Sequence, residues 1–411
     1  GYTDGMIIKY SVNGEIEWAK TIGGAKNETI NSVAATNDGG YIVVGKFSST
    51  NIDLGNGVVL TNNGGNDGML IKYSAEGRVE RAQVIGGEGS DSIDSVAACS
   101  DGGYVVCGIF SSQKLAIGDG KSLNLTSSYT TTAGMLIKYN YNGNVEYSNV
   151  LGTSGSYVNY FSSVTATKDG GYITVGKYWY NNCYNGVICR YNKNNEEIWT
   201  NMIYGNSKQY TADNNIKSVA VTNDGGYVVA GIFGCDSITL DNGVTLSRED
   251  GENYIIKYNK VDDIEWYKQI KGDGYIEEVA SYDDDVLVCG YYSSEKLKVD
   301  NKEITNVNKS NYNYWDGFVI NVIPQMGVPE VQELEVENKR QEFKIITDVK
   351  EIDNIKGGSI SGEDVIPYEK VKYGDSSLKE IKMIPDENYE IIGITVNDEE
   401  YQFSVNEDGS Y

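Results

Sequence analysis

Residues 32–45 read Ser-Val-Ala-Ala-Thr-Asn-Asp-Gly-Gly-Tyr-Ile-Val-Val-Gly, and variants of this phrase end at Gly108, Gly176, Gly231 and Gly290. A second phrase, Asp-Gly-Met-Leu-Ile-Lys-Tyr at residues 67–73, occurs six times, the last copy being truncated. Each unit contains four strand signals. The first two strands flank the Asp-Gly-Gly turn, in which glycine tolerates a positive φ. The second phrase supplies the third strand, and a stretch such as Ile16–Lys20 supplies the fourth strand.

Four strands in about 50–65 residues, repeated with no helical period between them, predict β-propeller blades. One such sheet buries neither face alone, so neighbouring sheets must stack around a common axis. Four units carry an additional hairpin between the second and third strands, whereas the third unit reads Lys-Tyr-Trp-Tyr-Asn-Asn-Cys-Tyr at 177–184. We therefore expect an all-β protein, with a propeller of five to six four-stranded blades over residues 1–323 whose ring is either closed or incomplete.

The repeat is lost after residue 323, where all four prolines of the chain lie. Residues 324–340 are predicted to form a linker, because Pro324 and Pro329 stiffen it. Residues 341–411 contain short alternating stretches and many charged residues, which predicts a small acidic β-rich domain, truncated in this chain. Because the chain starts at Gly1 and stops in a turn-like sequence, we expect a piece of a longer protein.

The composition excludes several classes of function. A net charge of −25 argues against nucleic-acid binding and against anionic membranes. The absence of histidine removes catalytic triads that use it and histidine metal ligands. No run approaches the roughly 20 apolar residues of a spanning helix, so we expect no membrane insertion of this piece.

The cysteines and the acidic turns offer little chemistry. Cys107, Cys189 and Cys289 occupy positions that carry small apolar residues in other repeats, so we expect free core thiols, with a Cys183–Cys235 bridge as the alternative. No metal site and no cofactor are predicted. Structural calcium remains an alternative at turns that contain Asp119, Asp241, Asp283 to Asp285 and Asp300.

A cation recurs near the end of the third strand, at Lys9, Lys72, Lys138, Arg190 and Lys257. Recurrence in every blade favours a structural role, because a ligand site is normally asymmetric. We expect these cations to pair with the aspartates of the Asp-Gly-Gly turns. The tryptophans of the fourth strands, Trp18, Trp199 and Trp266, are expected to pack in the core or at its edge, with stacking on a ligand as the alternative.

The most informative departure is the third unit, where aromatic residues replace the additional hairpin. Exposed aromatic side chains flanked by asparagine can stack on sugars or hold a protein partner, although tyrosine is abundant in this chain. The candidate ligand-binding residues are Tyr178, Trp179, Tyr180 and Tyr184, together with Tyr314 and Trp315 in a later loop. Tyr157, Tyr160 and Phe161 lie close to them in sequence. No catalytic residue stands out.

The order of these phrases resembles the bacterial β-propeller repeat family of secreted and surface proteins, and the strand order is similar to that of kelch blades. Residues 340–411, with Lys-Gly-Gly-Ser-Ile-Ser-Gly-Glu at 356–363, resemble a module of Gram-positive, clostridial-type surface proteins. The resemblance implies an extracellular, cell-surface or cell-wall-associated location. A propeller fold itself hosts enzymes and binding platforms alike.

We therefore expect a non-catalytic, monomeric surface or adhesion protein whose propeller recognises a glycan or a surface protein. One alternative is a carbohydrate-active enzyme with carboxylates at the propeller channel, which a buried pair of acidic residues there would favour. A second alternative is a structural spacer.

Overall fold

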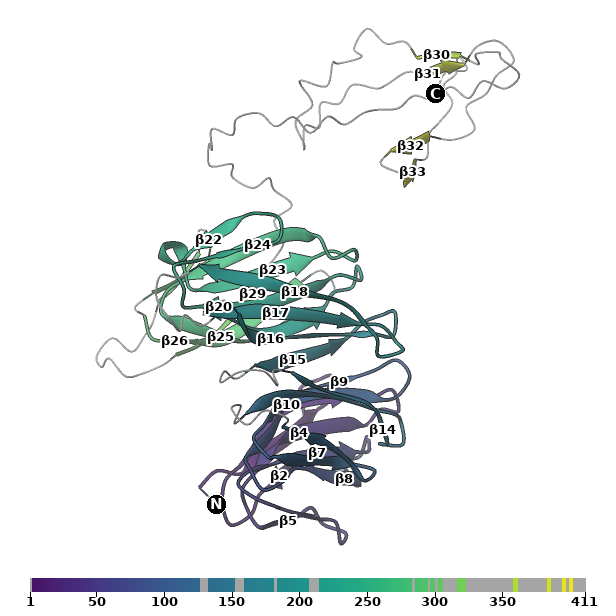
Figure 1. Ribbon diagram of the computed structural model, residues 1–411, viewed down its shortest axis with the longest axis vertical. Coiled ribbons are helices and arrows are strands. Elements are labelled where there is room, and N and C mark those ends of the chain that lie inside the picture. The colour runs from purple at the N-terminus through teal and green to yellow at the C-terminus, as the bar shows by residue number, and fades with distance from the viewer. Residues whose placement is uncertain are drawn as a thin grey trace. The chain divides into compact units, whose positions relative to one another are not determined.

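The computed structural model describes residues 2–125, 132–151, 159–180, 183–206, 214–282, 285–294, 296–299, 302–305 and 316–322, and the backbone of four short strands beyond residue 357. The chain divides into two compact units, Gly1–Pro324 and Gln325–Tyr411. The first unit is a five-blade β-propeller arrangement, preceded by a two-stranded sheet (Figure 1). The predicted all-β propeller is confirmed. In the described part of the chain, the 3₁₀ turn η1 (Arg248–Asp250) is the only helical segment, and no helix there could span a bilayer.

The sheets follow one another in chain order, as the change from purple to green in Figure 1 shows. The preceding sheet pairs β1 (Gly5–Tyr10) with β2 (Ile16–Ile22). Blade one contains β3 (Glu28–Ala35), β4 (Tyr41–Phe47), β7 (Asp67–Tyr73) and β8 (Val79–Ile85). Blade two contains β9 (Asp91–Ala98), β10 (Tyr104–Phe110), β13 (Ala133–Tyr139) and β14 (Val145–Leu151). Blade three contains β15 (Tyr160–Ala166), β16 (Tyr172–Tyr180), β17 (Cys183–Tyr191) and β18 (Glu197–Asn206). Blade four contains β19 (Asn214–Val221), β20 (Tyr227–Phe233), β23 (Asn253–Tyr258) and β24 (Ile264–Lys271). Blade five contains β25 (Gly274–Tyr282), β26 (Asp285–Tyr292) and β29 (Asp316–Val322).

The predicted additional hairpins are also present. They are β5 (Asn51–Asp53) with β6 (Val59–Thr61), β11 (Lys114–Gly118) with β12 (Lys121–Asn124), β21 (Ser237–Thr239) with β22 (Thr245–Ser247), and β27 (Lys296–Val299) with β28 (Lys302–Thr305). The second unit shows β30 (Gly358–Ile360) paired with β31 (Met383–Pro385), and β32 (Ile394–Val396) paired with β33 (Glu399–Tyr401). The linker predicted at 324–340 and most of the module predicted at 341–411 lie outside the described residues.

The innermost strands β3, β9, β15, β19 and β25 pack against one another in chain order. Each carries a one-residue bulge at the same place, opposite the glycine that ends the repeated phrase. A side chain cannot replace that glycine easily, because a methyl group at Gly108 would lie 2.1 Å from the carbonyl oxygen of Ser92. The repeated glycine therefore follows from the bulge.

Apolar side chains fill the spaces between successive sheets. Between blades one and two, Leu70 and Ile85 pack with Met135 and Ile137, and all four are fully buried. The central strand β7 is buried along its whole length, which explains its apolar run Met69-Leu70-Ile71, and two charged residues, Asp67 and Lys72, are buried with it. All six cysteines are free thiols, and five of them are buried.

Candidate functional site

The recurring cations are held by carboxylates of their own blade. Lys72 Nζ lies 3.0 Å from Asp38 and 3.3 Å from Glu80, and only its two acidic partners are substantially exposed. Lys138 and Lys257 repeat this arrangement in blades two and four. The Thr36 hydroxyl, the Gly40 amide and Lys72 lower the pKa of Asp38 to about 2, although burial opposes this. The expected pairing with the aspartates of the Asp-Gly-Gly turns is present, and each of these lysines pairs with an aspartate of its own blade.

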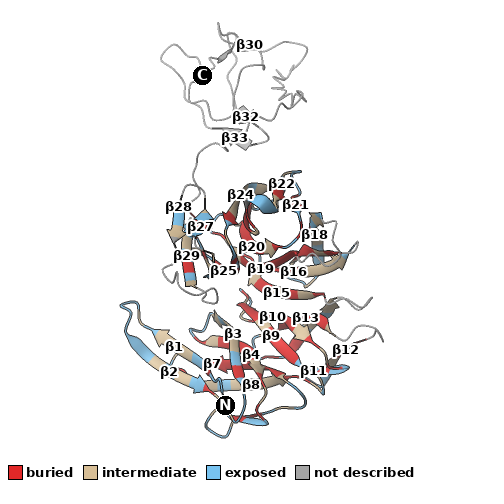
Figure 2. Cartoon of the chain, turned by 90° about the vertical axis from the view of Figure 1, so that its left-hand side faces the viewer, coloured by how far each residue is buried: buried red, intermediate tan, exposed pale blue. Residues whose placement is uncertain are grey.

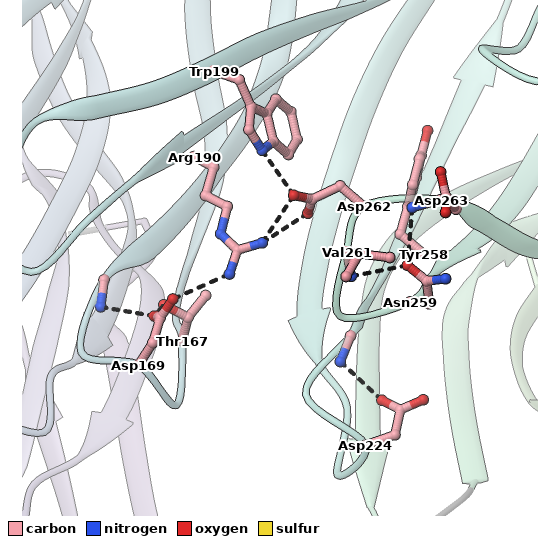
Figure 3. A network of polar contacts seen from close by, with 12 residues as sticks. Thr167, Asp169, Arg190, Trp199, Asp224, Tyr258, Asn259, Val261, Asp262 and Asp263 are labelled. Atoms are coloured by element: carbon pink, nitrogen blue, oxygen red, sulfur yellow. Dashed lines mark hydrogen bonds and ion pairs between the residues drawn. The ribbon is translucent and has the colours of Figure 1, made fainter. Parts of the chain in front are cut away.

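Blade three uses arginine at this position and thereby bridges two blades (Figure 3). Arg190 donates to Asp262 of the β23–β24 turn at 2.8 and 3.0 Å, and to Asp169 of its own blade at 3.1 Å. The indole N–H of Trp199 also donates to Asp262, at 2.9 Å. Trp18 likewise donates to Ala75 O of the following blade, so two of the fourth-strand tryptophans link successive blades.

Carbohydrate chemistry at the propeller channel would require paired acidic residues on the inner strands. Burial raises the pKa of Asp94 to about 6, and this side chain accepts bonds from Ser92 at 2.6 Å and Asn31 at 3.3 Å. Burial also raises the pKa of Glu278, which accepts a bond from the Ser218 hydroxyl. Asp94 and Glu278 lie on β9 and β25, with β15 and β19 between them in the order of inner strands. Each accepts its hydrogen bonds from neutral side chains.

Two fully buried carboxylates do occur together, between blades one and two. Asp91 accepts four hydrogen bonds, two at each oxygen, from Ser111 N, Ser112 N, Gly87 N and the Ser112 hydroxyl. Asp67 accepts from the backbone and side chain of Asn63 at 2.7 and 3.0 Å, and its other oxygen, Oδ1, has no partner. Burial, with a contribution from Asp91, raises the pKa of Asp67 to about 6. The two carboxylates hold the loops around them by hydrogen bonds. Because both side chains are fully buried, a substrate cannot reach them.

The aromatic residues of blade three lie on an extended hairpin. Here β16 and β17 each run for nine residues, and pairing continues to Tyr180 opposite Cys183. Trp179 stands opposite Tyr184, with ring centroids 4.9 Å apart and planes at 75°. Asn159 accepts the backbone N–H of Trp179 at 2.5 Å, and Asn185 donates to Tyr180 O at 3.0 Å, so the hairpin end is held by amide side chains.

The two faces of this hairpin differ. On one face, Lys177 Nζ lies 4.4 Å from the ring centroid of Tyr184 and 5.3 Å from that of Tyr160, in cation–π contacts. On the other face, Tyr180 lies 6.4 Å from Tyr204 of β18. Tyr180 and Tyr204 are 54% and 49% exposed, which makes them the most accessible rings of the group.

The structure brings together Trp179, Tyr180 and Tyr184 of the predicted site, whereas Tyr178 packs against the core between blades two and three. Tyr314 and Trp315 lie outside the described residues. Sequence reasoning missed Tyr204 and Lys177 as members of the group. A signal for Tyr204 existed, because blade one reads Ile-Gly-Gly at 85–87 where blade three reads Ile-Tyr-Gly at 203–205.

In the acidic turns that the structure describes, the carboxylates accept hydrogen bonds from other groups of the protein. Asp119 accepts the Val145 N–H at 2.5 Å, and Asp241 accepts from the Asn201 amide. Among the described residues, no group of three or more acidic or cysteine side chains could hold a metal ion.

No family model matches the chain, and no curated protein matches it. Solved structures show only distant similarity. Sqt1 from Chaetomium thermophilum is 13% identical, with 67% of this chain and 69% of Sqt1 covered and a TM-score of 0.33. The Bacillus subtilis arabinanase Arb43A is 12% identical, with coverages of 66% and 92% and a TM-score of 0.34. A cobalt-substituted Synechocystis ACO is 7% identical, with coverages of 78% and 62% and a TM-score of 0.31. At this level none of them indicates a function, and the resemblance to bacterial surface repeats stays a prediction.

Proposed function

We propose that this protein is a non-catalytic recognition platform that binds a neutral glycan on the aromatic end of the β16–β17 hairpin. The observation that carries the proposal is the exposed pair Tyr180 and Tyr204, backed by Trp179 and Tyr184 on the opposite face. Aromatic rings offer flat apolar faces to the C–H surfaces of sugars, and tyrosine hydroxyls add hydrogen bonds.

Electrostatics supports a neutral ligand. The net charge of −25 repels polyanionic glycans at long range. Near the hairpin, the cation Lys177 is engaged by two tyrosine rings. The acidic residues that could have acted in glycoside hydrolysis are held by hydrogen bonds to neutral groups, which favours binding over catalysis. The cell-surface location that the sequence suggested belongs to the same proposal, since surface proteins meet glycan ligands directly.

The test is a glycan array probed with the intact chain, followed by titration of the best neutral oligosaccharide. Replacing Tyr180 by alanine should weaken binding about tenfold or more, because it removes one ring of the exposed pair, and Trp179→Ala should also weaken binding, because its ring supports the hairpin end from the opposite face. Tyr141→Ala is the matched control, since Tyr141 is 60% exposed on blade two, away from this hairpin. Absence of any glycan binding, or equal affinity of the Tyr180→Ala, Trp179→Ala and unmodified proteins, would contradict the proposal.

A further inference from the structure

The first and last sheets of the propeller have uncovered apolar faces. Met6 of β1 is 65% exposed, whereas Met69 and Met135 at the same repeat position are fully buried. Val33 of β3 is 54% exposed, whereas its equivalent in blade two, Val96, is 6% exposed. The repeat sequence thus provides an internal reference, because the side chains at these positions are buried in other blades and exposed here.

Blade five is uncovered on the face directed away from blade four. Val319 is 72% exposed and occupies the position of the fully buried Leu70. At Gly68 an added methyl group would lie 2.9 Å from Ile93 of the next inner strand. At Gly317, the equivalent position, the nearest atom is 3.9 Å away and belongs to blade five itself. Figure 2 draws β1–β2 and β29 on the same side of the unit, with exposed and intermediate residues.

Polar contacts between the inner strands follow one rule. The backbone N–H groups of Val96, Val164, Val219 and Val279 each donate to the serine hydroxyl of the preceding inner strand, at 3.4, 3.2, 3.4 and 3.1 Å. The acceptors are Ser32, Ser95, Ser163 and Ser218 in the same order. On β25, the last inner strand, Glu278 occupies the position of these serines and supplies a carboxylate as the acceptor. Val33, on the first inner strand, is the corresponding donor position.

We infer that the surface formed by β1, β3 and blade five binds a two-stranded antiparallel hairpin with the inner-strand sequence of this same repeat. The outer strand of that hairpin pairs with the free edge of β1 and places its glycine opposite Met6, as Gly45 stands opposite Met69. The inner strand donates an N–H to Glu278, and its serine accepts the N–H of Val33. Its apolar residues cover Val33 and Val319.

Continuity with the existing interfaces selects this occupant. The four contacts between the five successive inner strands use the same valine, serine and bulge positions, so a sixth hairpin of this sequence meets partners already placed for it. Strand addition to an exposed sheet edge supplies backbone hydrogen bonds, and alternate side chains supply specificity.

The probe is a fluorescein-labelled synthetic peptide of residues 28–47, which is the β3–β4 hairpin. We expect saturable binding to the intact chain, slower amide exchange in β1, and no binding of a scrambled peptide. Met6→Asp should weaken binding roughly tenfold or more, because the charge would be buried. Val59→Asp is the matched control, since Val59 is 51% exposed on the separate β5–β6 hairpin.

A second measurement attaches the hairpin to the chain itself, so that the result does not depend on how the free peptide behaves in solution. Duplicating residues 28–47 ahead of Gly1 through a glycine-serine linker should raise the thermal midpoint above that of a scrambled duplicate. The inference is overturned if neither format shows an effect, or if Met6→Asp leaves binding unchanged. It is also overturned if ultracentrifugation shows dimers that Met6→Asp dissolves, because a second copy would then occupy the surface. These readouts do not depend on glycan binding.

Discussion

Replacing Asp67 by asparagine should stabilise this protein at neutral pH. Asp67 is fully buried, and its Oδ1 has no hydrogen-bond partner. Because its pKa is raised to about 6, the folded state holds this proton more tightly than the unfolded state does. The contribution of the group is therefore most favourable below pH about 4 and is lost as the pH rises through about 6. A rise from 3.8 to about 6, at about 1.4 kcal/mol per pH unit, corresponds to a penalty of roughly 3 kcal/mol at pH 7.5.

Asparagine removes this penalty without changing the shape of the side chain. Blade three already carries Asn185 at the equivalent position, where it accepts the Gly205 N–H at 2.9 Å. Urea unfolding, followed by tryptophan fluorescence at pH 4.5 to 7.5, should show Asp67→Asn more stable by up to about 3 kcal/mol at pH 7.5. The difference should shrink towards pH 4. The control Asp91→Asn should lose about 1–3 kcal/mol, because Asp91 accepts four hydrogen bonds. A stability difference that does not change with pH would refute the reasoning.

Three further substitutions test the packing between and within blades by urea unfolding. Gly108→Ala should cost about 3 kcal/mol, because the new methyl group meets a carbonyl oxygen at 2.1 Å, whereas Gly317→Ala should change little. Lys257→Met should cost about 2 kcal/mol, since it leaves two carboxylates and a carbonyl without their ammonium partner; an unchanged urea midpoint would show that solvent replaces it. Arg190→Lys should cost about 1 kcal/mol and speed amide exchange in the turn that carries Asp262, because one ammonium group cannot replace the two guanidinium nitrogens that hold Asp262 and Asp169. Exchange there at the unmodified rate would contradict the bridging role.

The repeat made the fold predictable, since strand positions, the Asp-Gly-Gly turns and the additional hairpins all follow from local sequence. Ion pairing of Lys72 was predictable for the same reason, as both partners recur. The bridge from Arg190 to Asp262 was not, because Asp262 belongs to a turn 72 residues away and has no equivalent partner in the other blades described.

The candidate site was predictable only in part. Aromatic residues at 178–184 stood out by composition, but Tyr178 packs against the core, whereas Tyr180, two residues further along the same face of β16, lies near the hairpin end and is exposed. Tyr204 lies near Tyr180 because β18 pairs with β17, and the register of this pairing cannot be predicted from the sequence of either strand alone. The raised pKa of Asp67 likewise depends on burial between two blades.

The position of blade three in the series has a mechanical consequence. In stacked arrays each unit is stabilised chiefly by its immediate neighbours, so local opening starts at the termini of the array and becomes rarer towards its middle. Blade three has a complete four-stranded neighbour on either side. Its aromatic hairpin should therefore keep its geometry while the outer units fray, which would let the terminal units exchange contacts without disturbing this hairpin.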